Sequence, residues 1–347
     1  MKDRGHINIL IAGRTGVGKS TLINAIFQGS FATTGQGRPV TQGTREIRKD
    51  GVPLSIFDTR GLEMADFPET LDSLKSLIQE RSVNIDPNQH IHIAWICISE
   101  DSRRVEPAEE ELVRMLEDRR IPILAVITKS RADNGFRAEV LRILPLVSNA
   151  VNVRAIKEEL DEGIILPPKG LKELVRATMQ IVPKGLENAF TAAQKVDIES
   201  KKNQSHMIVG LASASAAGIA LVPIPLADAA LIIPIQIGML ASISATFGLS
   251  IDQSFLSTII GSIISGTGGT LAGRFIAANL FKLIPGAGSA IGGTILASTA
   301  AAITIAIGEA YIAVLVMLFV KNDGEPPDLE EVAKDFKAKC LQITRVS

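Results

Sequence analysis

The chain has few of the residues that build covalent frameworks or metal clusters. Its 347 residues include two cysteines, Cys97 and Cys340, which excludes a disulfide framework and gives no metal-binding pattern. The four histidines have no ligand spacing. The net charge is −1 and no basic block occurs, so the composition indicates no nucleic-acid partner. Function must therefore be encoded in local motifs.

The N-terminus has no signal-peptide pattern, because a predicted strand begins at once, at residue 6. We therefore expect a cytoplasmic domain at this end of the chain. The length of 347 residues suggests about two domains.

Residues 13–20 read G-x-x-x-x-G-K-S, the pattern of a phosphate-binding loop. A β-branched apolar run at 6–12 precedes it, and the apolar residues of 21–27 have helical spacing. Strand, glycine loop and helix form the arrangement that the motif needs, because backbone N–H groups and the helix N-terminus then surround phosphate oxygens. The residues expected to contact nucleotide are Gly13, Arg14, Thr15, Gly16, Val17, Gly18, Lys19, Ser20 and Thr21. We expect Lys19 to reach the β- and γ-phosphates and the Ser20 hydroxyl to coordinate Mg²⁺.

A second motif, D-x-x-G at Asp58 to Gly61, follows a strand-like run at 52–57. It predicts a carboxylate beside the metal and a glycine N–H near the γ-phosphate. The intervening segment 35–46 is polar and glycine-rich, which predicts a mobile loop. A threonine there would complete the Mg²⁺ shell, and Thr41 and Thr44 both fit. The predicted metal ligands are thus Ser20, Asp58 and Thr41 (or Thr44), and the predicted catalytic residues are Lys19, Gly61 and Thr41.

Further apolar runs at 90–99, 121–127 and 150–155 complete a set of five predicted strands. Nearly continuous apolar runs are typical of a parallel sheet that is covered on both faces. Because these runs alternate with amphipathic helices, we expect a doubly wound α/β domain with ligand loops at the carboxyl ends of its strands.

The order and spacing of these motifs resemble the Era-like branch of the translation-factor-related GTPases, and more distantly the immunity-related and dynamin-like GTPases. The resemblance rests on G-R-T-G-V-G-K-S-T-L-I-N-A-I and D-G-V-P-L-S-I-F-D-T-R-G-L. It implies hydrolysis of GTP to GDP and phosphate with Mg²⁺. Thr128-Lys129 resembles the base-recognition motif N/T-K-x-D, whose lysine stem packs on guanine and whose aspartate accepts its N1–H and N2–H. Ala155 matches the position whose N–H bonds the guanine O6.

The chain departs from this pattern at two positions. Arg131 stands where the base-reading aspartate belongs, and Asp133 follows two residues later. Either the loop is lengthened and Asp133 reads guanine, or guanine selectivity is weaker; GTP is expected, and ATP stays open. Leu62 stands where Ras-like switches place a water-orienting glutamine. The family resemblance therefore implies slow hydrolysis that accelerates in a homodimer or larger assembly, with these arginines as cation sources: Arg14, Arg60, Arg103 and Arg104.

The segment from Met207 to Val320 is nearly free of charge. Its charged residues are Asp228, Asp252, Arg274, Lys282 and Glu309. Four uncharged windows, 207–227, 229–251, 253–273 and 283–308, are each about long enough to cross a bilayer, which takes roughly 20 residues. G-x-x-x-G patterns at Gly269–Gly273 and Gly288–Gly292 are typical of close helix packing in lipid. A soluble alanine-rich bundle has the same composition, so both interpretations stay open.

The run P-I-P-L-A-D at 223–228, Gln236 and the glycine-rich stretch 286–293 resemble a helical domain of unknown function appended to bacterial Era-like GTPases. This resemblance covers roughly residues 205–320, and the relatives of that domain include predicted membrane proteins. Lipid is therefore an expected partner. The predicted fold is an α/β P-loop GTPase domain followed by an all-α, Gly/Ala-rich domain. Its parts are a GTPase domain at 1–182, a connector helix at 183–206, an apolar helical domain at 207–320 and a tail helix at 321–347.

The predicted function is a GTPase whose nucleotide state is coupled to a membrane-associating helical domain. Two alternatives remain. One is a nucleotide-gated scaffold or tether with negligible turnover, and the other is a self-assembling mechanoenzyme of the dynamin-like or immunity-related kind.

Overall fold

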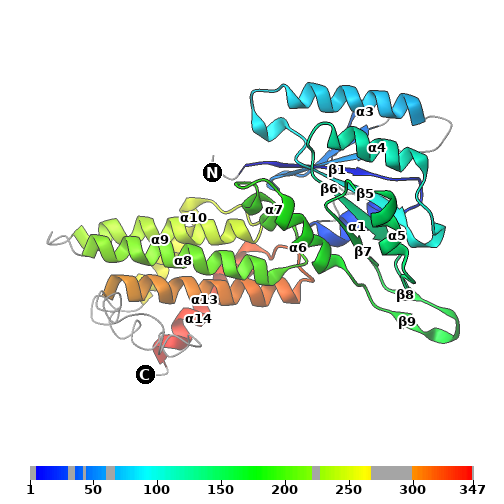
Figure 1. Ribbon diagram of the computed structural model, residues 1–347. Helices are drawn as coiled ribbons and strands as arrows, with labels where there is room; N and C mark the ends of the chain where they lie inside the picture. The colour runs from blue at the N-terminus through cyan, green and yellow to red at the C-terminus, as the bar shows by residue number, and fades with distance from the viewer. Residues whose placement is uncertain are drawn as a thin grey trace. The chain divides into compact units, whose positions relative to one another are not determined.

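The computed structural model describes residues 5–29, 36–41, 44–59, 67–220, 227–266 and 299–345. The chain divides into an α/β unit, Met1–Asp197, and a helical unit, Ile198–Ser347 (Figure 1). The α/β unit thus ends at Asp197, whereas the sequence predicted an end at residue 182. The predicted α/β fold with a helical C-terminal region is confirmed.

The α/β unit is built on a seven-stranded sheet with the order β2-β3-β4-β1-β5-β6-β7. The strands are β1 (Ile7–Ala12), β2 (Gln36–Thr41), β3 (Thr44–Arg48), β4 (Leu54–Thr59), β5 (Ile93–Ser99), β6 (Ile123–Thr128) and β7 (Asn149–Asn152). Strands β4, β1, β5, β6 and β7 are parallel, and β2 and β3 form an antiparallel edge. The five parallel strands are those that the apolar runs predict.

β1 lies inside the parallel part of the sheet, between β4 and β5. Successive side chains of a strand point to opposite faces of the sheet. Ile9 and Ile11 accordingly join one apolar core, and Leu10 and Ala12 join the other. Both faces of the sheet are therefore buried, which explains why the apolar run at 6–12 is continuous.

Helices cover the two faces of the sheet. Helices α3, α4 and α5 contribute to one core, and α1, α6 and α7 contribute to the other (Figure 1). Their bounds are α1 (Lys19–Ile26), α3 (Phe67–Ser82), α4 (Pro107–Glu117), α5 (Phe136–Ile143), α6 (Leu171–Ile181) and α7 (Glu187–Ala193). Short 3-10 turns are η1 (Pro87–Gln89), η2 (Glu100–Ser102) and η3 (Asp161–Gly163).

Strands β2 and β3 occupy most of the segment 35–46, in which the sequence predicted a mobile loop. β3 pairs antiparallel with β4, and Ile47 lies opposite Ile56. Ile47 is buried, while its neighbour Arg48 is exposed. This contrast between neighbours is that of an antiparallel strand covered on one face. A single buried isoleucine among polar residues was too weak a pattern to predict it.

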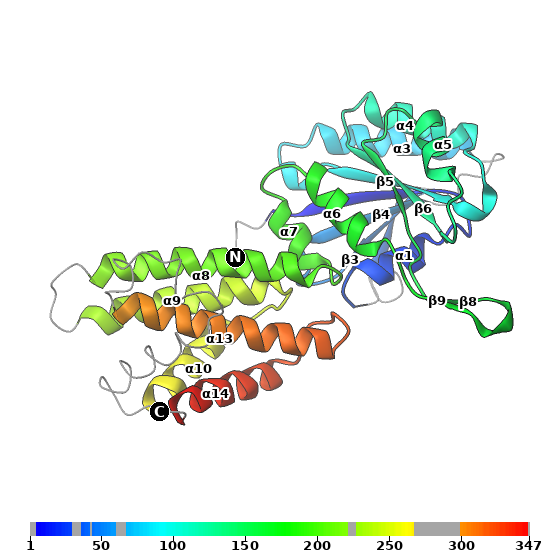
Figure 2. The same cartoon turned by 60° about the horizontal axis from the view of Figure 1, so that its bottom comes forward.

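β7 is the last strand of the sheet, on the side opposite β2. The guanidinium of Arg137 donates from Nε to the carbonyl oxygen of Ala150 at 2.6 Å and from Nη2 to Oδ1 of Asn149 at 2.9 Å. After β7, the strands β8 (Glu158–Glu159) and β9 (Ile165–Leu166) form an antiparallel hairpin. This hairpin projects from the α/β unit (Figure 2).

The helical unit contains α8 (Ile198–Ala220), α9 (Ala227–Thr246), α10 (Gln253–Gly266), α13 (Thr299–Lys321) and α14 (Leu329–Arg345). Helix α13 packs along α8 and also contacts α9 and α14 (Figure 2). The aromatic ring of Tyr311 packs edge-on against Phe336 at 4.9 Å, and its hydroxyl lies 2.7 Å from Oγ of Ser244. The apolar residues of α14, from Leu329 to Cys340, thus belong to the core of this unit or pack against it.

Residues 183–206 do not form the single connector helix that the sequence predicted. Helix α7 ends at Ala193, and α8 begins at Ile198. The turn between them is held by Gln194, whose side-chain oxygen accepts from the N–H groups of Val196 and Asp197, each at 2.7 Å. The amide competes with the helix for backbone donors, and this ends α7.

Among the described residues, one helical segment, Ala301–Lys321, is long and apolar enough to cross a membrane, with a mean hydropathy of 2.4. Most of it is buried inside the helical unit, as the core helix of a bundle would be. The two G-x-x-x-G patterns, Gly269–Gly273 and Gly288–Gly292, lie outside the described residues.

Candidate nucleotide-binding site

The phosphate loop connects β1 to α1, as the motif requires. Gly13 lies against β5 so closely that a Cβ atom there would be 2.4 Å from the carbonyl oxygen of Cys97. Gly16 and Gly18 have φ values of 77° and 98°, which favour glycine. Gly18 precedes α1, and no side chain of the described residues caps this helix. Its first N–H groups therefore face the loop, where an anion is stabilised.

Lys19 reaches across the loop that it ends. Its Nζ donates to the carbonyl oxygens of Gly13 at 2.7 Å and Arg14 at 3.2 Å. The ammonium thereby lies over the centre of the loop. The hydroxyl-bearing residues Ser20 and Thr21 follow in the first turn of α1 and are exposed.

Asp58 ends its strand beside the phosphate loop. It lies opposite Ile11 of β1 and Arg45 of β3 in the sheet register. Its Oδ1 is buried and has no hydrogen-bond partner among the described residues. Burial raises the pKa of Asp58, and the positive charges of Lys19 and Arg45 oppose that rise. A buried carboxylate oxygen without a hydrogen-bond partner is suited to coordinate a cation.

The two candidate threonines differ in what is described of them. Thr44 is buried at the start of β3, and its Oγ1 also has no partner among the described residues. Thr41 ends β2, and its side chain lies outside the described residues, as do Arg60, Gly61 and Leu62.

The loop after β6, residues 129–135, is called the base-side loop here because it carries the predicted base-recognition motif. Thr128 connects this base-side loop to the phosphate loop. Its Oγ1 donates to the carbonyl oxygen of Val17 at 2.6 Å and lies 3.3 Å from that of Ile98. Lys129 follows with a φ of 53° and an exposed side chain. Ala155 lies just beyond β7 and packs against the core under α1 and α6. A cavity of about 330 Å³ adjoins the loop and is lined in part by Thr15, Gly16, Val17, Asp101 and Lys129.

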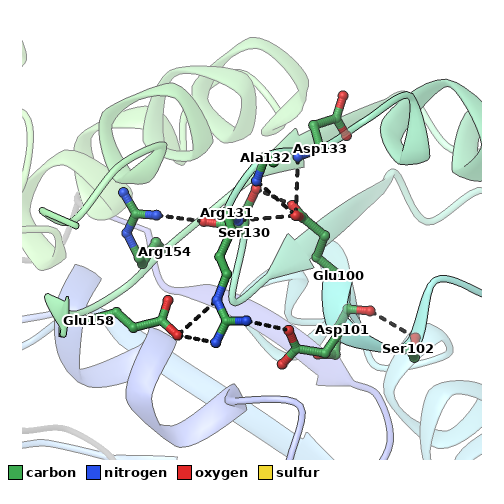
Figure 3. A network of polar contacts seen from close by, with 10 residues as sticks. Glu100, Asp101, Ser102, Ser130, Arg131, Ala132, Asp133, Arg154 and Glu158 are labelled. Carbon is green, nitrogen blue, oxygen red and sulfur yellow. Dashed lines mark hydrogen bonds and ion pairs between the residues drawn. The ribbon is translucent and has the colours of Figure 1, made fainter. Parts of the chain in front are cut away.

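Glu100, which no sequence motif marks, organises the loop after β6 (Figure 3). Its Oε1 accepts from the backbone N–H groups of Arg131, Ala132 and Asp133, each at 3.1 Å. Its Oε2 accepts from the Ser130 hydroxyl at 2.5 Å. Burial alone would raise the pKa of Glu100, but these hydrogen bonds lower it below the ordinary value. The only sequence signal was an acidic residue directly after a buried strand.

Arginine and lysine side chains fix the same loop from the other side. Buried Arg154 donates from Nη1 to the carbonyl oxygen of Ser130 at 2.9 Å and from Nε to that of Pro167 at 2.8 Å. Lys169 donates to the carbonyl oxygen of Arg131 at 2.8 Å. The loop backbone is therefore bonded through both its donors and its acceptors.

The side chains of Arg131 and Asp133 leave this loop at opposite ends (Figure 3). The Arg131 guanidinium bonds to Glu158, with Nε 2.9 Å from Oε1, and lies 3.9 Å from Asp101. Asp133 accepts from the N–H of Arg137 at 2.8 Å, at the start of α5. The Asp133 carboxylate thus bonds to the first turn of α5.

The predicted cation sources have different partners. Arg14 and Arg104 both pair with Glu106, at 3.0 Å and 2.6 Å. Arg103 donates to the carbonyl oxygens of Asp133 and Asn134, and its guanidinium lies over the ring of Phe136. Arg103 therefore binds the base-side loop from the segment after η2.

The geometry just described agrees with comparisons to known proteins. A family model for 50S ribosome-binding GTPases matches residues 8–129, and a model for a domain of unknown function (DUF697) matches residues 187–340. The chain is a P-loop GTPase with a C-terminal DUF697 domain. The predicted GTP-binding domain is thus confirmed.

The curated relatives are distant. The P-loop GTPase is 25% identical to the tRNA modification GTPase MnmE of Treponema denticola over 182 residues, which cover 51% of this chain and 35% of that protein. It is 26% identical to MnmE of Alkaliphilus metalliredigens over 202 residues, which cover 57% of this chain and 39% of that protein. The chain thus spans little more than a third of the length of these relatives. A solved structure of a probable GTP-binding protein, engB, is 18% identical and covers 50% of this chain and 97% of that one, with a TM-score of 0.36.

Proposed function

We propose that this P-loop GTPase hydrolyses GTP to GDP and phosphate with Mg²⁺, and that its nucleotide state controls docking of the helical unit on a lipid bilayer. In this proposal it is a cytoplasmic member of the Era-like branch that associates reversibly with membranes. The observation that carries the membrane part is a helix face without charge on the helical unit.

At the phosphate end, the proposed roles follow the geometry of the loop. The N–H groups of residues 13–21 surround the phosphates, and the Lys19 ammonium neutralises the β- and γ-oxygens. The Gly61 N–H and the hydroxyl of Thr41 (or Thr44) contact the γ-phosphate. The two segments that carry these groups, 35–46 and 58–61, therefore respond to the presence of that phosphate. At the base end, Thr128 holds Lys129 under the base, and Ala155 donates its N–H to guanine O6.

The residues present fit Mg²⁺. Asp58 offers a buried oxygen without a partner among the described residues, and Ser20 offers an exposed hydroxyl in the first turn of α1. Oxygen ligands of this kind, together with phosphate, are those that Mg²⁺ prefers. When bound, the ion neutralises charge on the triphosphate.

The uncharged face lies on α8, beyond its charged first half. From residue 207 onward the exposed residues of α8 are apolar, small or hydroxyl-bearing: Met207, Gly210, Leu211, Ala214, Ser215 and Gly218. The side chains of Met207 and Leu211 are 65% and 73% exposed. A helix that faces water normally carries charge on its outer face. Helix α8 thus has a charged first half and an uncharged, partly apolar second half. This combination favours a bilayer interface as the partner of the uncharged face.

A path for coupling exists at the end of the α/β unit. Helix α1 carries Lys19 and Ser20 at its start, and its end contacts the segment that leads to α8. There the N–H of Lys195 donates to the carbonyl oxygen of Ile26 at 2.8 Å, and the amide of Gln28 donates to that of Ala192 at 3.0 Å. A change at the phosphate end of α1 therefore has a bonded route to residues 192–197.

Flotation with vesicles of phosphatidylcholine and phosphatidylglycerol tests the proposal. The full chain is expected to float to different extents with GDP and with a non-hydrolysable GTP analogue. Leu211→Glu should abolish flotation because it places a charge on the uncharged face. Asn203→Glu is the matched control, since Asn203 is exposed on α8 before this face begins, and it should float like wild type. Equal or absent flotation in both nucleotide states would overturn the proposal.

The same samples distinguish the two alternatives. A hydrolysis rate per molecule that rises steeply with protein concentration, without lipid, would favour the self-assembling mechanoenzyme. A negligible steady-state rate under all conditions, together with nucleotide-dependent flotation, would favour the scaffold or tether.

A further inference from the structure

Arg131 occupies the position at which the N/T-K-x-D motif has its base-reading aspartate, and it cannot replace that aspartate chemically. Guanine presents N1–H and N2–H donors beside its O6 acceptor. A guanidinium has five N–H donors and no acceptor. Selective recognition of guanine therefore requires a carboxylate from another position.

Asp133 is not free to supply it. Its own N–H is bonded to Glu100, and its carboxylate accepts from the N–H of Arg137 at 2.8 Å. Its φ of 62° fixes the residue in the left-handed region. The carboxylate lies at the far end of the network from the Arg131 guanidinium (Figure 3). Moving this carboxylate toward the base would break its hydrogen bond to the first turn of α5, where the ring of Phe136 is buried.

Glu158 is the carboxylate that Arg131 holds at the other end. Both hydrogen bonds from Arg131, from Nε and Nη2, end on Oε1 of Glu158, so Arg131 does not use Oε2. The Glu158 side chain is 27% exposed. The bond from Arg131 lowers the pKa of Glu158, and the charges of Arg154 and Lys129 lower it further. Glu158 is thus ionised at neutral pH and within electrostatic reach of Lys129.

The position of Glu158 in the chain agrees with such a role. Glu158 begins β8, three residues after Ala155. The stem of Lys129 is expected to pack on the plane of the base, and the N–H of Ala155 is expected to bond its O6. Glu158 therefore follows Ala155 closely in the chain, and the charge of Lys129 acts on its carboxylate.

We propose that Glu158 reads guanine by accepting from N1–H and N2–H, and that Arg131 is the positioning residue that orients it. The inference rests on the proposed placement of the base on Lys129. In this proposal, the carboxylate that reads the base lies on the β8–β9 hairpin and not in the N/T-K-x-D motif. Selectivity for guanine is therefore kept.

Binding of GTP and of xanthosine triphosphate to the full chain tests this. In Glu158→Gln, an amide donates to the xanthine O2 where the carboxylate accepted from N2–H. GTP should then bind roughly 10- to 100-fold more weakly, the loss expected for one charge-assisted contact. The ratio of the two dissociation constants should shift toward xanthosine triphosphate by at least that factor.

Two matched variants separate reading from a structural role. Asp133→Asn neutralises the other candidate carboxylate, and Glu159→Gln neutralises the exposed carboxylate next to Glu158 on β8. Both should leave the ratio of the two dissociation constants unchanged. Arg131→Gln should weaken GTP without a shift toward xanthosine triphosphate, since it misplaces Glu158 but leaves it charged. An equal loss of GTP, ATP and xanthosine triphosphate in Glu158→Gln would mean a structural role and would overturn the inference. A switch in Asp133→Asn would overturn it as well.

The proposed function fails by a different result. Wild type that binds no GTP, or that ignores vesicles, contradicts the proposed function. The shift in base preference is measured by binding alone, without hydrolysis or lipid.

Discussion

A Cβ atom on Gly308 of α13 would lie 2.5 Å from Cγ2 of Val209 on α8, closer than two side chains can pack. Gly308→Ala should therefore destabilise the helical unit. Overpacking costs about 1–3 kcal/mol, and the roughly 1 kcal/mol gained in helix propensity offsets only part of it. Urea unfolding of Gly308→Ala, Val209→Ala and the double variant measures the coupling. The double variant should lose less than the two single losses combined; strict additivity would contradict the close contact.

Lys19→Ala should abolish binding of a fluorescent GTP analogue and leave the melting temperature within a few degrees of wild type. The lysine bonds only to carbonyl oxygens of its own loop among the described residues, so its loss removes charge from the phosphate site without opening a core. Lys75→Ala is the control, because Lys75 is an exposed lysine paired with Asp72 on α3. Undiminished binding by Lys19→Ala would refute the assignment of the phosphate loop.

Asp58→Asn should stabilise the nucleotide-free protein at neutral pH while it removes the Mg²⁺ dependence of nucleotide affinity. Burial raises the pKa of Asp58 above its ordinary 3.8. A raised pKa in the folded state means that the ionised carboxylate destabilises folding at pH values above that pKa. The stability advantage of Asp58→Asn should therefore shrink as the pH falls toward 3.8. Urea unfolding at pH 7.5 and pH 4.5, and a Mg²⁺ titration of nucleotide binding, check both parts.

Glu100→Gln should destabilise the α/β unit and loosen the base-side loop. The folded-state pKa of Glu100 is below its ordinary 4.5, so the ionised carboxylate contributes stability above pH 4.5 that is lost as the pH falls through the folded-state pKa. Hydrogen bonds to a charged group contribute about 1.5–3 kcal/mol each and are not additive. We expect a loss near that range at pH 7 and a smaller gap from wild type at pH 4. Glu111→Gln, on the exposed surface of α4, should show neither effect.

The parallel sheet and the phosphate loop could be predicted because their signals are local. Each buried strand is a continuous apolar run, and G-x-x-x-x-G-K-S encodes its own backbone geometry. The pair β2–β3 could not be predicted in this way, since Ile47 alone marks its buried face. The break between α7 and α8 depends on one amide, Gln194, that bonds the two N–H groups after it.

The base-side loop was predicted only in outline. Thr128 and Lys129 could be identified from the motif, but Glu100 bonds to backbone groups about thirty residues away, which no sequence pattern records. The partner of Arg131 was equally hidden, because Glu158 lies on a hairpin of two-residue strands whose propensity is weak.

The guanidinium of Arg137, which reaches from α5 to β7, limits how copies of this chain can associate. It occupies the carbonyl oxygen of Ala150 on the last strand of the sheet, so a strand from another molecule would first have to displace a charged side chain. Growth of the sheet from molecule to molecule is therefore blocked at this edge. If the chain assembles through its α/β unit, the blocked edge directs that contact elsewhere, and fibre formation through β7 is disfavoured at high protein concentration.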